Sequence, residues 1–564
     1  MKKYNILLLL AVLLFTACSE DKLNIAQKGV IDIKDFYITD ADATSALVDA
    51  YANFATNIGG NDGIYVPYNI MYNYLADNVL AAGNMYGDND QFASINEYRY
   101  DTQSSVVKAM YNRFYFTIYH CNLVINNFKV TDSPVKARCI AEAKVMRAWC
   151  HMMLAMGWDN PPLVDKVLSG SDKPANFKDG HDAMLQWCAT ECADAVQYLD
   201  ERKATTDKDG AVKVTKGFAW TVQGKALLYK GDYAGAKTAL KNVITSGKYA
   251  LVPGNRWASL FHIEGDGCEE KVFETNLINT AGIGDWGGKI QRSTWMESNL
   301  WGWRTDRLAA QPTCQADGGW GGLAIEENFA NEFAANDGNS ARRKATMVNY
   351  NEFITDPSVG WATDATLTTD AAKQADPKRG IKNPDGLYGQ CLYLQKKFIV
   401  SATDRPTNWY RFNNFIIERY ADVLLMYAEA CANTTDADGS GLQALKDVQL
   451  RAGSAHVSAT LTLADVKKEK NYELWNEGTR WIDLKRWKET GKLANVGKHI
   501  PSLKDHFFDA TSPSATHVAY VTYSEPNTAA GKTFGFVAGK HELFPYPYSV
   551  TSINPNIVQN PGWK

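Results

Sequence analysis

The chain has 564 residues, a formal net charge of −4 at pH 7 and a charged fraction of 22%. The net charge is close to neutral and the sequence contains no long basic run. Both observations argue against a nucleic-acid partner. A hydrophobic fraction of 45% is typical of a globular protein with a large core. The 16 Trp and 28 Tyr are more than such a core needs, so we expect many of these rings at surfaces, where flat faces can stack on a ligand or partner.

The first 40 residues predict export and a lipid anchor. Two lysines precede an apolar run at residues 6–15, which is too short to span a bilayer but typical of a signal peptide. The run ends in Phe-Thr-Ala-Cys, which resembles the lipobox of bacterial lipoproteins, where cleavage precedes the cysteine and its thiol is acylated. We therefore expect a signal peptide at residues 1–17, lipidation at Cys18 and a linker as far as residue 40. An ordinary secretory signal is the alternative.

Helical periodicity recurs along the first half of the chain. Apolar residues spaced three and four apart predict helices at residues 41–56, 104–128, 135–157 and 183–199. Residues 59–91 lack this period and are rich in glycine, asparagine and tyrosine, so we expect an irregular loop there.

Two later segments have the pattern of helix-pair repeats. If Trp220 is the first marker of a tetratricopeptide repeat, the other markers in residues 217–251 fall in register: Gly224, Gly231, Tyr233, Ala236 and Leu240. A second helix pair is expected at residues 418–451. Such pairs must stack on neighbours to bury their faces, so we interpret them as a scaffold.

Between the two repeat pairs lies an irregular stretch of about residues 252–417. Helical periodicity is weak there, whereas tryptophan and glycine are frequent. Long irregular insertions on a regular scaffold commonly carry function. We therefore expect this stretch to carry the ligand-binding site.

The candidate binding residues are chosen for sugar recognition. Sugars present apolar C–H faces and a ring of hydroxyls, so a binder needs flat aromatic platforms beside amide or charged groups. Packing in the core is the commoner role for any single tryptophan, but the cluster as a whole favours an exposed platform. The candidates are Asn84 and Tyr86 from the early loop, with Trp286, Trp295, Trp301, Trp303 and Trp320 from the insertion.

The stretch 471–493, NYELWNEGTRWIDLKRWKETGKL, is predicted to be a helix interrupted only by Gly478. Glu477 with Arg480, and Asp483 with Arg486, have the i,i+3 spacing of surface ion pairs. Two tryptophans among these charges could indicate a catalytic cluster. We prefer a structural interpretation, in which this stretch fastens other parts of the chain together.

No recognised catalytic motif is present, since HExxH, GxSxG, the P-loop and the Rossmann fingerprint are all missing from the sequence. One stretch resembles a calcium-binding loop, because Asp436, Asp438, Ser440 and Asp447 have suitable spacing. The same residues can make a turn and cap the following helix, which is the interpretation that we prefer. We expect no cofactor, and leave a structural calcium as the alternative.

Three separated motifs resemble the SusD/RagB family. The run near the C-terminus is similar to the family's signature helix at Glu477, Gly478, Arg480, Trp481, Asp483, Leu484, Lys485, Arg486 and Trp487. A mid-chain helix and its exit match at Glu142, Arg147 and Pro162-Leu163-Val164. The C-terminal Leu-Phe-Pro-x-Pro, Asn-Pro-Asn and Gln-Asn-Pro-Gly sequences match at Leu543, Phe544, Pro545, Pro547, Asn554, Pro555, Asn556, Gln559, Asn560, Pro561, Gly562 and Trp563.

The resemblance implies a single domain at residues 41–564. It would be dominated by helices, with about four tetratricopeptide-like helix pairs, long irregular insertions and a few short β-strands. The implied function is capture of a glycan at the outer-membrane surface of a Gram-negative bacterium and its delivery to a TonB-dependent, SusC-like porin. No enzyme activity is expected. Two alternatives stay open, namely a peptide or other nutrient as the cargo, as in the RagB branch, and a surface glycoside hydrolase.

Overall fold

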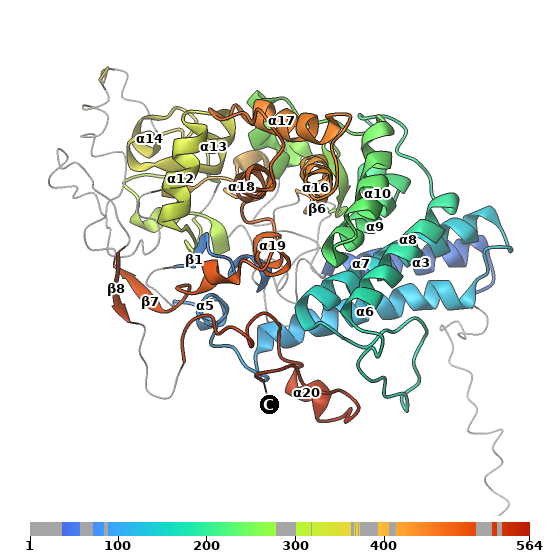
Figure 1. Cartoon of the computed structure of the whole chain (residues 1–564). Coiled ribbons are helices and arrows are strands. Elements are labelled where there is room, and N and C mark those ends of the chain that lie inside the picture. Colours follow the sequence, from blue (N-terminus) through green and yellow to red (C-terminus); the bar gives the residue numbers. More distant parts are fainter. Residues whose placement is uncertain are drawn as a thin grey trace, which may run out of the picture.

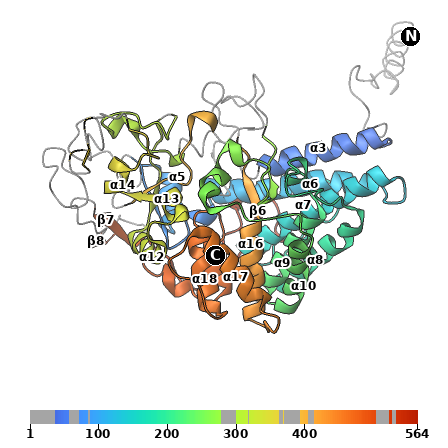
Figure 2. The ribbon, with the colours of Figure 1, turned by 90° about the horizontal axis from the view of Figure 1, so that it is seen from above.

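A computed structural model of the chain describes residues 36–56, 71–83, 88–277, 300–316, 318–361, 366, 368–369, 372, 393–404, 413–502, 522–526 and 533–563. Helices dominate these residues (Figure 1). Figure 2 shows a stack of long helices on one side of the molecule and the shorter elements of the insertion on the other. The fold class expected from the sequence is confirmed.

The first half of the chain builds the long-helix side. The helices are α3 (Asp40–Thr56), α5 (Asp90–Asn96), α6 (Ser105–Asn127), α7 (Pro134–Trp158) and α8 (His181–Ala195). The four predicted helices are confirmed as α3, α6, α7 and α8 with small shifts at their ends, whereas α5 was not predicted. Ser133 caps α7 by accepting a hydrogen bond from the backbone of Lys136, and Pro134 occupies the first turn, where it is tolerated. Because α3, α6 and α8 all pack against it, α7 is buried over most of its length.

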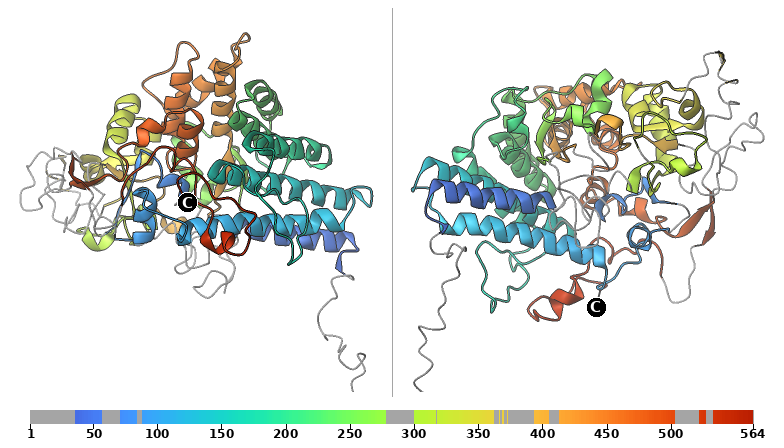
Figure 3. Two further views of the ribbon diagram at one scale, coloured as in Figure 1. Left: turned by 60° about the horizontal axis from the view of Figure 1, so that its bottom comes forward. Right: turned by 180° about the vertical axis from the view of Figure 1, so that it is seen from behind.

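The two predicted repeat pairs are present as α9 (Lys216–Lys230) with α10 (Tyr233–Thr245), and α16 (Tyr420–Ala432) with α17 (Ser440–Ala452). At Gly224 an added Cβ would lie 2.6 Å from Leu240 Cγ, so this glycine lets the two helices of the first pair approach closely. Helix α10 packs against α16, although the insertion separates them in the sequence. The scaffold is therefore one continuous stack, as Figure 3 shows from two further sides.

The calcium-like sequence forms the turn that we preferred. Asp436 accepts hydrogen bonds from the backbone N–H groups of Gly441 (2.6 Å) and Leu442 (2.9 Å), at the start of α17. Asp438 accepts one from Ser440 and forms an ion pair with Lys241 at 3.0 Å. These carboxylates therefore hold the start of α17 and the neighbouring α10.

We expect Asp436→Ala to lower the free energy of unfolding by about 1 kcal/mol, because two N–H groups of the first turn lose their acceptor. Urea unfolding followed by circular dichroism measures this, with and without added calcium. Asp447→Ala serves as the control, because its exposed carboxylate accepts a hydrogen bond from the exposed Gln443 side chain on the same helix and from no backbone N–H group of the described residues. A calcium-dependent rise in wild-type stability that both variants abolish would contradict the turn interpretation.

The prediction of one helix at residues 471–493 is wrong. Helix α18 (Leu463–Glu473) ends before it, α19 (Arg480–Arg486) follows, and a 3₁₀ turn occupies Thr490–Leu493. The break has a backbone cause, since Asn476 and Gly478 have φ angles of 58° and 83°, in the left-handed region. A contact from the early part of the chain fixes the break, because Gly478 N–H donates to Asn73 Oδ1 at 2.6 Å.

The insertion and the C-terminal region contain short elements. Among the described residues, four two-stranded antiparallel sheets pair β1 (Val79–Ala81) with β3 (Leu323–Ile325), β2 (Lys271–Glu274) with β6 (Ile416–Arg419), β4 (Met347–Asn349) with β5 (Tyr393–Gln395), and β7 (His499–Ser502) with β8 (Thr522–Pro526). The short helices are α12 (Glu327–Asp337), α13 (Ala341–Thr346), α14 (Tyr350–Thr355) and α20 (Tyr548–Thr551). Every sheet except β7–β8 joins segments that lie far apart in the sequence.

Candidate ligand-binding surface around Trp320

The pairing of β1 with β3 brings the early loop to the insertion. Leu80 lies opposite Ala324 in this ladder, and Ala82 N–H extends it by donating to Gly322 O at 3.1 Å. Asn84 and Tyr86 follow β1 along the chain, and Trp320 lies shortly before β3. The two candidates from the early loop lie outside the described residues, so their contribution to this surface stays a prediction. The ladder does place the starting points of both candidate segments side by side.

Trp320 is flanked by two glycines on each side, at positions 318, 319, 321 and 322, which we call the glycine frame. It is the only residue with a side chain in the run 318–322, and 37% of its surface is exposed. The glycines are required by close packing, since an added Cβ at Gly319 would lie 2.2 Å from the carbonyl carbon of Gly302. Gly319 N–H donates to Trp303 O at 2.6 Å and Gly321 N–H to Gly302 O at 2.9 Å. The backbone beneath Trp320 is therefore held by hydrogen bonds while its ring reaches the surface.

Trp301 and Trp303 do not form an exposed platform, so the prediction is wrong for these two residues. Each is only 1% exposed. Trp303 Nε1–H donates to the carbonyl oxygen of Gln395 at 2.7 Å, and the Trp301 ring packs against Phe398 at 5.0 Å. They lie under the surface and support the backbone that carries Trp320. Trp286 and Trp295 lie outside the described residues.

Charged side chains lie close to the glycine frame. An added Cβ at Gly318 would lie 2.6 Å from Thr305 Oγ1, so the turn at residues 304–307 lies directly beside the frame. In that turn Asp306 forms ion pairs with Arg304 at 2.9 Å and Arg307 at 3.2 Å, and it is more than half exposed. Trp320 therefore combines an exposed ring with nearby hydrogen-bonding groups, which is the combination that a sugar requires.

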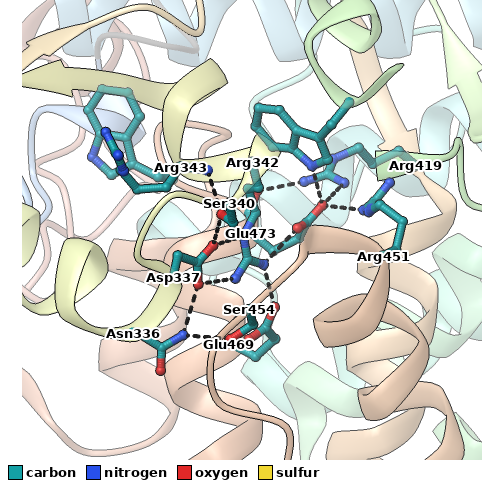
Figure 4. Close-up of polar contacts among 12 residues, drawn as sticks. Asn336, Asp337, Ser340, Arg342, Arg343, Arg419, Arg451, Ser454, Glu469 and Glu473 are labelled. Carbon is teal, nitrogen blue, oxygen red and sulfur yellow. Dashed lines mark hydrogen bonds and ion pairs between the residues drawn. The ribbon is translucent and has the colours of Figure 1, made fainter. Parts of the chain in front are cut away.

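A buried cluster of charged residues around Glu473 is structural. Glu473, fully buried on α18, accepts hydrogen bonds from Arg342, Arg419 and Arg451, and Arg342 also pairs with Asp337 at 2.9 Å (Figure 4). Burial alone would raise the pKa of the Glu473 carboxyl, but the three guanidinium groups hold it well below its ordinary value. The cluster is closed to solvent and joins the insertion to β6, α17 and α18.

The stretch that includes α19 joins distant parts of the chain, as we predicted. One of its two expected ion pairs is present and the other is replaced by different pairs. Asp483 and Arg486 do pair, at 2.8 Å. Glu477 does not pair with Arg480. It binds Arg419 and Lys397, whereas Arg480 forms two hydrogen bonds to Asp77, at 2.7 and 2.8 Å.

One buried carboxylate pair has the character that a hydrolase would need. Burial raises the pKa of Glu418 to about 7, while Asp422 beside it has a lowered pKa despite its burial, because of the charges of Lys225 and Lys470. Lys225 Nζ lies 2.5 Å from Glu418 and 3.0 Å from Asp422. Glu418 on β6 and Asp422 on α16 are buried residues, and neither belongs to the lining of the cavity around Phe273 or of the cavity around Asn78. This arrangement does not favour a hydrolase.

Comparison with known proteins points to one family. The sequence profile of the SusD family matches residues 297–563. This C-terminal part of the chain is therefore similar to the SusD family. A SusD-like protein of Bacteroides ovatus is 22% identical over 521 residues, which cover 86% of this chain and 83% of the relative. The chain thus resembles a curated relative over nearly its whole length, including the scaffold that precedes the matched region.

Solved structures agree with the fold of this chain. Surface glycan-binding protein A from Bacteroides thetaiotaomicron, in complex with laminarihexaose, superposes with a TM-score of 0.67 and 20% identity, over 93% of this chain and 100% of that one. Surface glycan-binding protein A from Bacteroides fluxus gives 0.68 and 18%, over 93% and 99%. Within the described residues, no helix is both long and apolar enough to cross a membrane.

Proposed function

We propose that this protein is a cell-surface glycan-binding lipoprotein of the SusD/RagB family that captures an oligosaccharide or polysaccharide and passes it to a SusC-like, TonB-dependent porin. The observation that carries the glycan part is Trp320, exposed in a glycine frame beside the start of the early loop. Similar solved structures are described as surface glycan-binding proteins, one of them holding laminarihexaose. The anchor at Cys18, the outer-membrane location and the porin partner rest on the lipobox and on the family.

Binding follows from the chemistry of the surface. The Trp320 ring packs on the apolar C–H face of one sugar, and its glycine frame holds the ring in place before the ligand arrives. Hydroxyl groups of neighbouring sugars reach the Arg304–Asp306–Arg307 turn. No bond of the glycan is broken, since capture and transfer need only association and release.

We expect Trp320→Ala to weaken glycan binding by about 2 kcal/mol, or roughly thirtyfold in Kd, because an exposed aromatic anchor carries a large share of binding energy. The test is calorimetric titration of the protein from Ser19 onward against plant, host and microbial polysaccharides, with laminarin among them. Tyr548→Ala is the matched control, because this ring is 55% exposed on α20.

Equal affinity of the Trp320 and Tyr548 variants would exclude Trp320 from the site. Binding to peptides, with no response across the polysaccharide panel, would assign the protein to the peptide-binding branch of the family. Release of shorter sugars during the titration would instead indicate a hydrolase.

A further inference from the structure

A second cleft lies at the opposite end of the β1–β3 ladder from Trp320. Asn78 directly precedes β1 and Glu326 directly follows β3, and both line a cavity of about 350 Å³. At roughly 3.4 Å per residue, Asn78 lies about 14 Å along the strand from Ala82, where the candidate surface begins. The volume falls at the lower end of the range for ligand clefts. This cleft is therefore distinct from the Trp320 surface.

The walls of the cleft are fixed by contacts between distant segments. Arg480 from α19 forms two parallel hydrogen bonds to Asp77. The carbonyl oxygen of Asn78 accepts hydrogen bonds from the backbone N–H of Glu326 and from Trp475 Nε1. These contacts hold the polar side chains in place without a ligand, so the cleft is pre-formed.

Asn78 carries an unused acceptor at this cleft. The residue is 2% exposed, and its Nδ2 donates to Asn471 Oδ1 at 2.8 Å. Its Oδ1 has no hydrogen-bond partner among the residues that the structure describes. A buried amide oxygen normally has a partner, so this atom favours a site that takes a water molecule when empty and a donor group of a ligand when filled.

The charges of the lining favour a neutral ligand over a cation. Asp77 is already neutralised by Arg480. The Glu326 carboxylate caps α12 by accepting from Phe329 N–H and also accepts from Asn328, while burial raises the pKa of its carboxyl. The two other charged residues of the lining, Glu332 and Lys492, are exposed and have opposite charges, so the lining carries little uncompensated buried charge. Hydroxyl groups satisfy the unused acceptor, and carry no charge that would need a counterion.

We infer that this cleft is a second carbohydrate-binding site, which takes a short, neutral, hydroxyl-rich saccharide. The inference rests on the proposed function for the class of ligand, but it uses none of the residues of the Trp320 surface. The protein then holds sugar at both ends of one ladder. The second site is a cleft with a mostly polar lining, whereas the first is an exposed aromatic ring.

The test is saturation-transfer NMR with the protein from Ser19 onward and a panel of neutral mono- and disaccharides, supplemented by glucosamine and free lysine as cationic probes. Asn495→Trp blocks the cleft, because Asn495 is an exposed residue of its lining, and Asn127→Trp is the matched control on α6. Asn78→Ala removes the unused acceptor. Trp320→Ala removes the aromatic face.

We expect saccharide signals to persist in Trp320→Ala and Asn127→Trp, to disappear in the double variant Trp320→Ala/Asn495→Trp, and to show about two- to tenfold weaker binding in Trp320→Ala/Asn78→Ala. Signals that Trp320→Ala alone abolishes, or that Asn495→Trp leaves unchanged, would overturn the second site and leave the first standing. Signals from the cationic probes alone would overturn the neutral class of ligand. No signal from any probe would overturn the second site, while the polysaccharide titration decides the proposed function separately.

Discussion

Glu473→Ala should lower the free energy of unfolding by about 3–5 kcal/mol, because breaking a buried ion network leaves charges without their partner. The carboxylate is fully buried and accepts from Trp257 Nε1 as well as from three arginines. Urea unfolding monitored by tryptophan fluorescence measures the loss. Its effect is expected to exceed that of any surface charge change, since the network joins four parts of the fold.

The control for this experiment is Asp306→Asn, which removes an exposed charge that also pairs with two arginines. Exposed pairs contribute less than about 1 kcal/mol, so its unfolding curve should lie near that of the wild type. If Glu473→Ala unfolded at the same urea concentration as this control, the other carboxylates around Arg342 and Arg419 would be sufficient to hold the network.

Glu429→Gln should remove part of the acid sensitivity of the protein. Burial would raise the pKa of Glu429, but the charges of Arg486 and Lys470 lower it to about 2, against 4.5 for the free side chain. A carboxyl with a lowered folded-state pKa stabilises the protein above pH 4.5 and loses that contribution as the pH falls towards 2. The loss is about 3 kcal/mol, so the variant should be less stable at neutral pH and show a shallower decline in acid.

The measurement is urea unfolding at neutral pH and at steps between pH 4.5 and 2. Trp487→Phe is the matched variant, because Trp487 Nε1 donates to the same carboxylate at 2.7 Å without carrying charge. It should cost about 1 kcal/mol at neutral pH and change the acid slope less than Glu429→Gln does, because the Trp487 hydrogen bond is a smaller cause of the lowered pKa than the charges of Arg486 and Lys470. Parallel curves for Glu429→Gln and the wild type would show that other groups cause the acid decline.

The scaffold could be predicted from the sequence because its signals are local. The helical period of the apolar residues and the cap at Ser133 predict α7. The repeat spacing of Gly224 and Leu240 predicts the contact between α9 and α10. The break at Asn476 could not be predicted in this way. Positive φ is uncommon for residues other than glycine, and here the break is coupled to a hydrogen bond between Gly478 and Asn73, which lie 405 residues apart.

The candidate site was only partly predictable for a similar reason. Trp301 and Trp320 look alike in the sequence, but Trp301 is buried because residues near Gln395, 94 positions later, close over it. A local signal did exist in the glycines that flank Trp320 on both sides, since such a run lacks the side chains that would cover a ring. The cleft at Asn78 has no local signal, because its lining comes from four separate segments.

The many contacts of α19 set the order in which the molecule can be completed. This helix and the turn before it bind Asn73, Asp77, Lys397, Arg419 and Glu429, all of which leave the ribosome earlier. Until the last fifth of the chain is present, each of these groups lacks at least one of its partners. A polypeptide that ends before α19 is therefore a ready substrate for proteases. The native state therefore requires that α19 has been synthesised. Exposure of its unpaired partners distinguishes a truncated chain from one that contains this helix.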